Sequence, residues 1–263
     1  MNRLSVIFFA IFCFIMINSC EVLKQVAKDF DLDPTITAQL TEREVIQGLK
    51  SALEVGTTAG VDQLAQTNGY LQDEAVKLLL PAELQSAITQ LKSTAAGRKV
   101  YDELIKDIEA DMIVSLNRAA EKAVVKAKPI FVNAITSMTI QDGFDILKGS
   151  DNAATTYLRN KTFSQLVNAF KPDIKDVLDE PIVYNRSPEQ LYSSFVKTYN
   201  DVERNDIINA LNLSPINEQD LASFVTSRAL DGMFQKIALK EKDIRDNPSA
   251  RINDILKKVF AQQ

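Results

Sequence analysis

The stretch that decides the fold is residues 99–128, KVYDELIKDIEADMIVSLNRAAEKAVVKAK. Its apolar side chains recur at steps of three or four residues, which places them on one face of an α-helix. They are Val100, Leu104, Ile108, Met112, Leu116, Ala120, Ala123 and Ala127. Acidic residues gather in the first half and lysines in the last turns, the order that the helix dipole favours. We therefore predict a long helix that Pro129 closes, with Leu116 buried against a neighbouring helix.

Helical spacing continues on both sides of this stretch. Thr41 and Glu44 have the spacing of a capping box, which predicts that a helix begins there. Further helices are predicted over 71–80, 82–93, 130–137, 140–148, 151–160, 162–179, 188–201 and 217–244, and a last one is predicted to begin at Asn247-Pro248. No convincing run alternates with a period of two, as a half-buried strand would. The sequence predicts an all-α fold, a single compact multi-helix domain over residues 41–263.

The N-terminus has the pattern of an export signal. Arg3 precedes an apolar run of about fourteen residues, which is shorter than the roughly twenty that a membrane span needs. The run ends in Ile17-Asn18-Ser19-Cys20, which resembles the bacterial lipobox, in which the cysteine is acylated and becomes the new N-terminus. The alternatives are a plain cleaved signal, a retained anchor, or Cys20 as an ordinary buried or disulfide-bonded cysteine.

On the lipobox interpretation, residues 1–19 are a lipoprotein signal peptide, and residues 20–40 are the lipidated N-terminus and a tether. Cys13 leaves with the signal, so Cys20 has no intramolecular partner, and acylation protects its thiol in an oxidising compartment. The expected partner is then the lipid bilayer, through acylated Cys20. The expected location is the bacterial cell envelope, with the domain facing the periplasm.

Composition limits the chemistry. The chain carries a net charge of −5, which becomes −6 when Arg3 is removed with the signal, so we expect no nucleic-acid partner. It contains no histidine, which excludes His-based catalysis and His metal ligation. With Cys20 acylated no thiol remains for catalysis or for a soft metal. No phosphate-binding or nucleophile-elbow motif occurs. We predict no cofactor and no metal, and a binding protein rather than an enzyme.

Several segments resemble one family of bacterial exported proteins. They are Arg118–Ala123 with Ala127–Phe131, Met138–Gly149, Asp151–Tyr157, Ala229–Phe234 and Ile244–Arg251, together with Leu40–Glu42 and Gly48–Lys50. They resemble the family filed as domain of unknown function 4197, over about residues 40–263. The resemblance implies one domain. It implies no established activity, so no catalytic residue can be assigned from it.

The densest polar patch spans residues 139–161. Its candidate ligand-binding residues are Asp142, Asp145, Asp151, Tyr157 and Arg159. They could surround a small polar ligand, or a hard cation such as Ca²⁺, although the spacing does not match an EF-hand loop. The alternative is helix capping, because Asp142 and Asp151 both stand where a helix is expected to begin.

Two other polar groups are weaker candidates. Arg118, Glu121, Lys126 and Lys128 could order a functional group or form surface ion pairs. Arg245 and Arg251 flank a helix start and could hold an anion or pair with carboxylates.

Three classes of function remain open. The first is a non-catalytic lipoprotein that binds a small polar ligand or an envelope protein. The second is a hydrolase of envelope glycans that works through two carboxylates, which need no histidine. The third is a structural helper for other envelope proteins. The sequence favours binding, because the usual catalytic residue types are absent.

Overall fold

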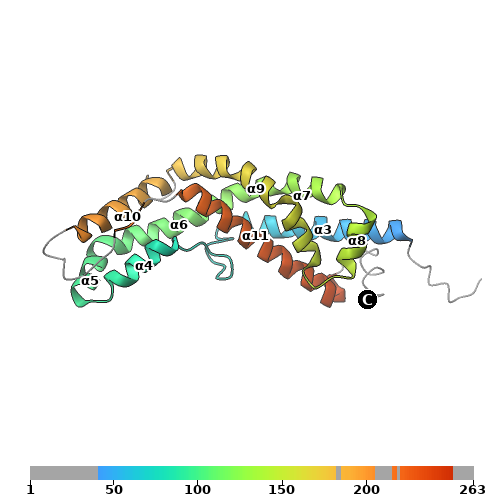
Figure 1. The fold of residues 1–263 in the computed structure, drawn as a ribbon, viewed down its shortest axis with the longest axis horizontal. Coiled ribbons are helices and arrows are strands. Elements are labelled where there is room, and N and C mark those ends of the chain that lie inside the picture. The colour runs from blue at the N-terminus through green and yellow to red at the C-terminus, as the bar shows by residue number, and fades with distance from the viewer. Residues whose placement is uncertain (1–40, 182–184, 205–214, 218–219, 251–263) are drawn as a thin grey trace, which may run out of the picture. The chain divides into compact units, whose positions relative to one another are not determined.

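The computed structural model describes residues 41–181, 185–204, 215–217 and 220–250 of the chain. No β-strand occurs among these residues, and from Glu42 onward the chain forms one compact unit, so the predicted all-α fold is confirmed. In chain order the helices are α3 (Glu42–Leu64), α4 (Ala82–Leu91), α5 (Ala95–Val100), a π-helical turn (Tyr101–Ile105), α6 (Lys106–Ala123), a 3₁₀ turn (Val124–Lys126), α7 (Ala127–Thr136), α8 (Ile140–Leu147), α9 (Ala153–Asp179), α10 (Pro188–Glu203), α11 (Leu221–Asp246) and a 3₁₀ turn (Pro248–Ala250) (Figure 1). Among the described residues no helix is long and apolar enough to cross a membrane.

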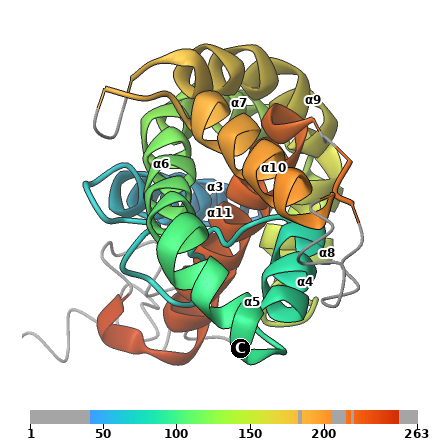
Figure 2. The same ribbon diagram turned by 90° about the vertical axis from the view of Figure 1, so that its left-hand side faces the viewer.

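The two longest helices, α9 and α11, share the most extensive packing, and α3 lies against α11 and α7. Helix α10 packs on α6, and the two lie side by side in both views (Figures 1 and 2). At the meeting point of α7 and α11, the rings of Phe131 and Phe234 stand edge to face with centroids 5.7 Å apart. Aromatic pairs favour this geometry. Phe163 of α9 lies beside the same ring, so one aromatic cluster joins three helices.

The predicted apolar face is confirmed within α6 but is wrong at Leu104, which lies in the preceding π-helical turn and is 49% exposed, while Ile105 is buried in its place. Met112, Leu116 and Ala120 have no exposed surface, and α9 and α10 both pack on α6. The prediction of one uninterrupted helix over 99–128 is wrong, because a π-helical turn precedes α6 and a 3₁₀ turn follows it. Pro129 does not close the helix either. It is the third residue of α7, in the first turn, where a backbone N–H has no helical partner to lose.

The predicted helix over 71–80 is absent, and turns and irregular backbone take its place. Polar side chains of α6 capture the backbone groups that a helix would have used. The Glu121 carboxylate accepts hydrogen bonds from the N–H groups of Tyr70 and Leu71, at 3.2 and 3.3 Å. The Asn117 side chain accepts a hydrogen bond from the Leu78 N–H and donates one to the Leu78 carbonyl oxygen. Tertiary contacts have therefore overridden the local preference of this segment.

Residues 151–179 were expected to form two helices and form one, α9. Pro172 lies inside it and is exposed, so the carbonyl that loses its donor faces water. The predicted helix over 217–244 is α11, which begins later, at Leu221, with Asp220 as its N-cap. The last predicted helix is described only as far as Ala250, and Cys20 with its lipobox also lies outside the described residues.

Candidate functional site

A groove of about 470 Å³ opens between α7, α8 and α9, at the polar patch that the sequence singles out. Its lining residues are mostly hydroxyl, amide and charged side chains: Asn133, Ala134, Ser137, Thr139, Asp142, Tyr157, Lys161, Thr162 and Gln165. Two of the five predicted ligand-binding residues, Asp142 and Tyr157, therefore meet in one groove. We call it the polar groove.

A capping box builds one end of the polar groove. The Thr139 hydroxyl accepts a hydrogen bond from the Asp142 N–H, and the Asp142 carboxylate accepts one from the Thr139 N–H at 3.0 Å. The two residues thus fix the start of α8 and each other's position. Asp142 thus takes part in capping, as the alternative interpretation predicted, but as the third residue of α8, and Thr139 is the N-cap. This arrangement leaves the carboxylate at the edge of the groove.

At neutral pH the Asp142 carboxyl group is ionised and the neighbouring Tyr157 phenol is protonated. Hydrogen bonds from Thr139, first from its backbone and then from its side chain, lower the pKa of Asp142, and the Lys161 charge lowers it further. Burial and the nearby Asp142 charge raise the pKa of Tyr157. The neutral Tyr157 hydroxyl donates a hydrogen bond to the Asp142 carboxylate at 3.3 Å. The groove thus contains a fixed anion beside a neutral aromatic donor.

Lys161 supplies the positive charge of the polar groove. It lies one helical turn beyond Tyr157 on α9, with its ammonium nitrogen 5.6 Å from the centre of the tyrosine ring. Its side chain is exposed, and no described carboxylate lies within ion-pair distance of it. A ligand with hydroxyl groups and a charged group would find complementary partners here. Asp142 can accept hydrogen bonds from ligand hydroxyl groups, and Lys161 can pair with a ligand anion. The side-chain amides of Asn133 and Gln165 can donate or accept hydrogen bonds.

The other three predicted site residues lie elsewhere. Asp145 accepts a hydrogen bond from Gln141 at 2.8 Å, one turn earlier on α8. Asp151 forms an ion pair with Lys242 of α11 at 3.1 Å. It does not cap α9, whose N-cap is Asn152.

Arg159 also lies away from the polar groove. Its guanidinium is paired with Asp231 of α11 at 2.6 Å and lies 4.5 Å from the centre of the Phe163 ring. It therefore links α9 to α11 and to the aromatic cluster. Such contacts make Arg159 a packing residue as well as a charged one.

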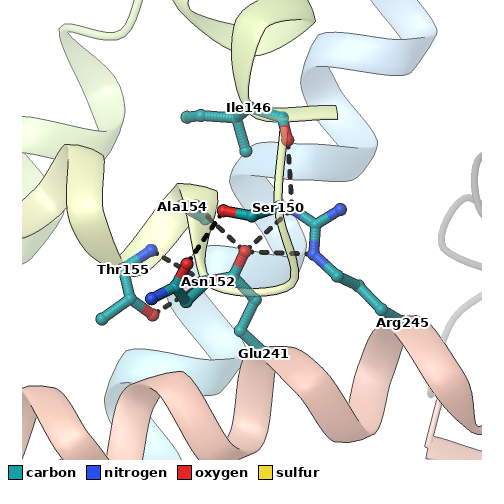
Figure 3. A network of polar contacts seen from close by, with 7 residues as sticks. All are labelled: Ile146, Ser150, Asn152, Ala154, Thr155, Glu241 and Arg245. Atoms are coloured by element: carbon teal, nitrogen blue, oxygen red, sulfur yellow. Dashed lines mark hydrogen bonds and ion pairs between the residues drawn. The ribbon is translucent and has the colours of Figure 1, made fainter. Parts of the chain in front are cut away.

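A buried network that the sequence did not predict lies at the start of α9 (Figure 3). The Asn152 side chain does not cap this helix. The Glu241 carboxylate of α11 accepts hydrogen bonds from the N–H groups of Ala154 and Thr155 instead, at 2.9 and 2.8 Å. Arg245 pairs with the same carboxylate at 2.8 Å and donates to the carbonyl oxygen of Ile146, at the end of α8. One ion pair thus joins the start of α9, the end of α8 and the C-terminal turns of α11.

This network decides between the two interpretations of Arg245. Its side chain is 8% exposed and that of Glu241 is 9% exposed, so the pair is buried. The guanidinium is already engaged by a carboxylate and a carbonyl, and an adjoining cavity of about 20 Å³ is roughly the size of one water molecule. Arg245 therefore joins helices and does not present an anion site. Arg251, its predicted companion, lies outside the described residues.

The remaining candidates form ion pairs. Arg118 pairs with Glu121 at 2.5 Å and donates to the side chain of Asn68, which holds the loop after α3 against α6. Lys126 pairs with Asp173 at 3.1 Å. Lys128 also pairs with a carboxylate, that of Asp62 in α3. These contacts match the ion-pair interpretation of this group.

Two acidic side chains of α6, Asp107 and Asp111, influence each other's charge. Burial and the neighbouring Asp107 charge raise the pKa of Asp111, while Arg186 opposes the shift. These two residues lie one turn apart on α6 and do not line the polar groove. Within the described ranges no three acidic, Cys or His side chains gather as a metal site.

A comparison with known protein families identifies the family of this chain. A family model described as "Protein of unknown function (DUF4197)" matches residues 39–261. The chain belongs to this family. The resemblance seen in the sequence is thereby confirmed, while no curated protein and no solved structure matches the chain. DUF4197 membership identifies the helical unit and assigns it no activity.

Proposed function

We propose that this DUF4197 protein is a lipid-anchored, non-catalytic binding protein of the bacterial cell envelope, whose helical domain takes a small polar ligand in the polar groove. In this proposal residues 1–19 are the signal peptide, residues 20–40 the lipidated N-terminus and tether, and residues 41–263 the binding domain facing the periplasm. The short apolar run and the Ile17–Cys20 lipobox support the anchor.

The observation that carries the ligand site is the charge arrangement of the polar groove. An ionised carboxylate at Asp142, a neutral phenol at Tyr157 and an ammonium group at Lys161 line one concave surface. A few convergent polar groups in a concavity of several hundred Å³ are typical of small-molecule sites. Sugars, amino sugars and amino acids carry the hydroxyl and charged groups that would complement these side chains.

The carboxylates favour binding over glycan hydrolysis. A glycosidase needs two carboxyl groups about 5–10 Å apart across a cleft, one of them with a raised pKa. Glu121 and Glu241, whose side chains are largely buried, instead accept hydrogen bonds from backbone N–H groups and pair with arginines. Their surroundings make them structural, which supports a binding domain.

A thermal-shift screen of the full-length protein tests the ligand site. The compounds are monosaccharides, amino sugars and amino acids. A ligand at about 100 times its Kd stabilises the folded state by roughly 2.7 kcal/mol, which raises the Tm of a domain of this size by several degrees. We expect at least one class to do so for the wild type, and Lys161→Ala to abolish the shift.

Lys175→Ala is the matched control. It removes the same charge from the same helix, at a side chain that is 68% exposed and lies outside the polar groove. It should keep the ligand-induced shift. If no compound raises the Tm, or if Lys161→Ala keeps the full shift, the polar groove is not the ligand site.

A further inference from the structure

A second groove, of about 270 Å³, lies between α11 and the irregular segment that leads into α4. One wall comes from residues 75–85 and the other from one face of α11: Ala75, Val76, Lys77, Leu78, Leu79, Leu80, Ala82 and Gln85 face Phe224, Arg228, Asp231, Gly232 and Gln235. It shares no lining residue with the polar groove. We call it the α11 groove.

The backbone of one wall is held like a strand. The buried Asn117 side chain donates to the Leu78 carbonyl at 2.8 Å and accepts from the Leu78 N–H at 2.9 Å. Both backbone groups of Leu78 therefore point to the same side, toward α6, as they do in an extended strand. The backbone groups of the next residue in such a strand point to the opposite side.

Leu79 is that next residue, and it has the features of an open strand edge. Its N–H and C=O have no hydrogen-bond partner among the residues that the structure describes. The residue is 50% exposed, whereas its neighbours Leu78 and Leu80 are buried. An open edge beside exposed apolar surface is a template for pairing with another extended chain.

On the α11 wall, Gly232 allows a close approach of the two walls and Arg228 supplies a positive charge. At Gly232 a β-carbon would lie 3.1 Å from Val76, so the glycine lets the two walls approach closely. Arg228 is exposed, lies 5.8 Å from the ring of Phe224, and forms no ion pair with a described residue. Asp231, the acidic residue of this wall, is already neutralised by Arg159. The remaining charge is therefore positive.

We propose that the α11 groove binds an extended peptide segment of another protein. The peptide backbone pairs with the N–H and C=O of Leu79, one apolar side chain enters between Leu79 and Phe224, and a neighbouring acidic side chain meets Arg228. Peptide recognition by strand addition works in this way, with backbone bonds for affinity and pockets for alternate side chains. The N–H and C=O of Leu79 favour a peptide, which can pair with both groups, over an apolar small molecule, which cannot. The positive charge of Arg228 favours a peptide that carries an acidic side chain.

The test starts from a display library of random dodecapeptides selected on the full-length protein. A recovered peptide is synthesised, labelled and titrated by fluorescence anisotropy. We expect an apolar residue next to an acidic one in the recovered peptides, and a loss of affinity of at least tenfold with Arg228→Glu. Arg43→Glu, which reverses another exposed arginine at the start of α3, should leave the affinity unchanged.

Peptide chemistry tests the backbone pairing on the wild-type protein, so it does not depend on how a variant folds. N-methylation of successive amides should weaken binding at alternate positions only, because alternate N–H groups of a paired strand face its neighbour. Failure to recover any peptide, unchanged affinity with Arg228→Glu, or an N-methyl pattern without alternation would overturn the proposal. Lys161→Ala should not change peptide affinity, which separates this result from the fate of the polar groove.

Discussion

Gly97 occupies a place in α5 where a side chain has no room. A β-carbon there would lie 1.9 Å from the carbonyl oxygen of Leu91, and this atom belongs to the backbone and cannot rotate away. Gly97→Ala should therefore lower the free energy of unfolding by about 1–3 kcal/mol, the usual cost of overpacking. Urea denaturation of the purified protein measures it.

Gly56→Ala is the matched control for Gly97→Ala. At Gly56, inside α3, a β-carbon would make only an ordinary contact, 3.9 Å from the Lys240 side chain. Alanine favours a helix interior over glycine by about 0.5–1 kcal/mol, so this change should stabilise the protein. Opposite signs for the two substitutions are the expected result. A neutral Gly97→Ala would mean that the turn between α4 and α5 adapts.

Leu116 tests the core that the sequence predicted. The side chain has no exposed surface and lies on the face of α6 that packs against its neighbours. Leu116→Ala should lower the free energy of unfolding by about 2–5 kcal/mol, from lost burial and the cavity left behind. Leu104→Ala, at a side chain that is 49% exposed, should cost less than about 0.5 kcal/mol. Equal losses at the two sites would contradict this assignment of the core.

At the same scale, the sequence could predict only contacts that are close along the chain. The Thr139–Asp142 capping box spans three residues, and its type and spacing are visible in the sequence. Lys161 stands at the end of the predicted polar patch but is not among its candidate residues, because nothing local shows that its helix returns beside Asp142. The partner of Arg159 is 72 residues away, and the Glu241 cap of α9 acts over 86 residues. Such partners follow from how helices pack, which periodicity alone does not determine.

The start of α9 depends on a carboxylate from another helix, which makes Glu241 a test at the scale of whole elements. Glu241→Ala would leave a buried Arg245 without its carboxylate and two N–H groups of α9 without an acceptor. Removing one partner of a buried pair costs about 3–5 kcal/mol, and we expect a loss of that size in urea denaturation.

Asp179→Ala is the control for Glu241→Ala. It breaks the Lys175–Asp179 pair, which has the same four-residue spacing but lies on the surface, and should cost at most about 0.5 kcal/mol. Hydrogen exchange adds a second readout. If Glu241 anchors the start of α9, the amides of Ala154 and Thr155 should lose protection in Glu241→Ala. Unchanged protection would mean that the helix start is held by other contacts.

The start of α11 should respond to acid. The Lys171 ammonium group, followed by the Ser223 N–H, lowers the pKa of Asp220 from 3.8 to about 2. Because the folded-state pKa is the lower one, the carboxylate stabilises the fold fully above about pH 4, and this contribution disappears as the pH falls toward 2. The side chains of this pair are 44% and 55% exposed, so we expect a contribution below about 1 kcal/mol.

Asp220→Asn isolates that contribution, because asparagine keeps the N-cap acceptor and removes the charge. The difference in free energy of unfolding between wild type and variant should be constant above about pH 4 and shrink toward pH 2. Urea denaturation across that range measures it. A difference that does not change with pH would show that the Lys171 pair contributes nothing to stability.

Element by element, the sequence predicted most helices and failed where tertiary contacts compete with local preference. Apolar periodicity gave α4, α8 and α10 nearly to their ends. It predicted a helix over 71–80, where Asn117 and Glu121 of α6 bind the backbone instead. Pro129 was predicted to close a helix, but it lies in the first turn of α7.

At the scale of the whole molecule, the two proposed binding sites are separate grooves that share no lining residue. The polar groove has an anion, a phenol and a cation held by α8 and α9. The α11 groove has an open backbone edge and an exposed arginine. Arg159, which the sequence assigned to the first, instead holds the wall of the second through Asp231. A lipid anchor would present both surfaces to the same compartment.

The lipid anchor makes the prediction with the widest consequence for the molecule. If Cys20 is acylated and becomes the N-terminus, Cys20→Ser should leave the precursor uncleaved by the lipoprotein signal peptidase, with residues 1–19 still attached. Mass spectrometry of the protein purified from a bacterial host measures this directly. Cys13→Ser is the matched control, because that cysteine lies in the apolar run that would be removed, and it should mature to the wild-type acylated mass. If Cys20→Ser also matures by losing residues 1–19, a plain signal peptide has been cleaved and the domain is released without a lipid.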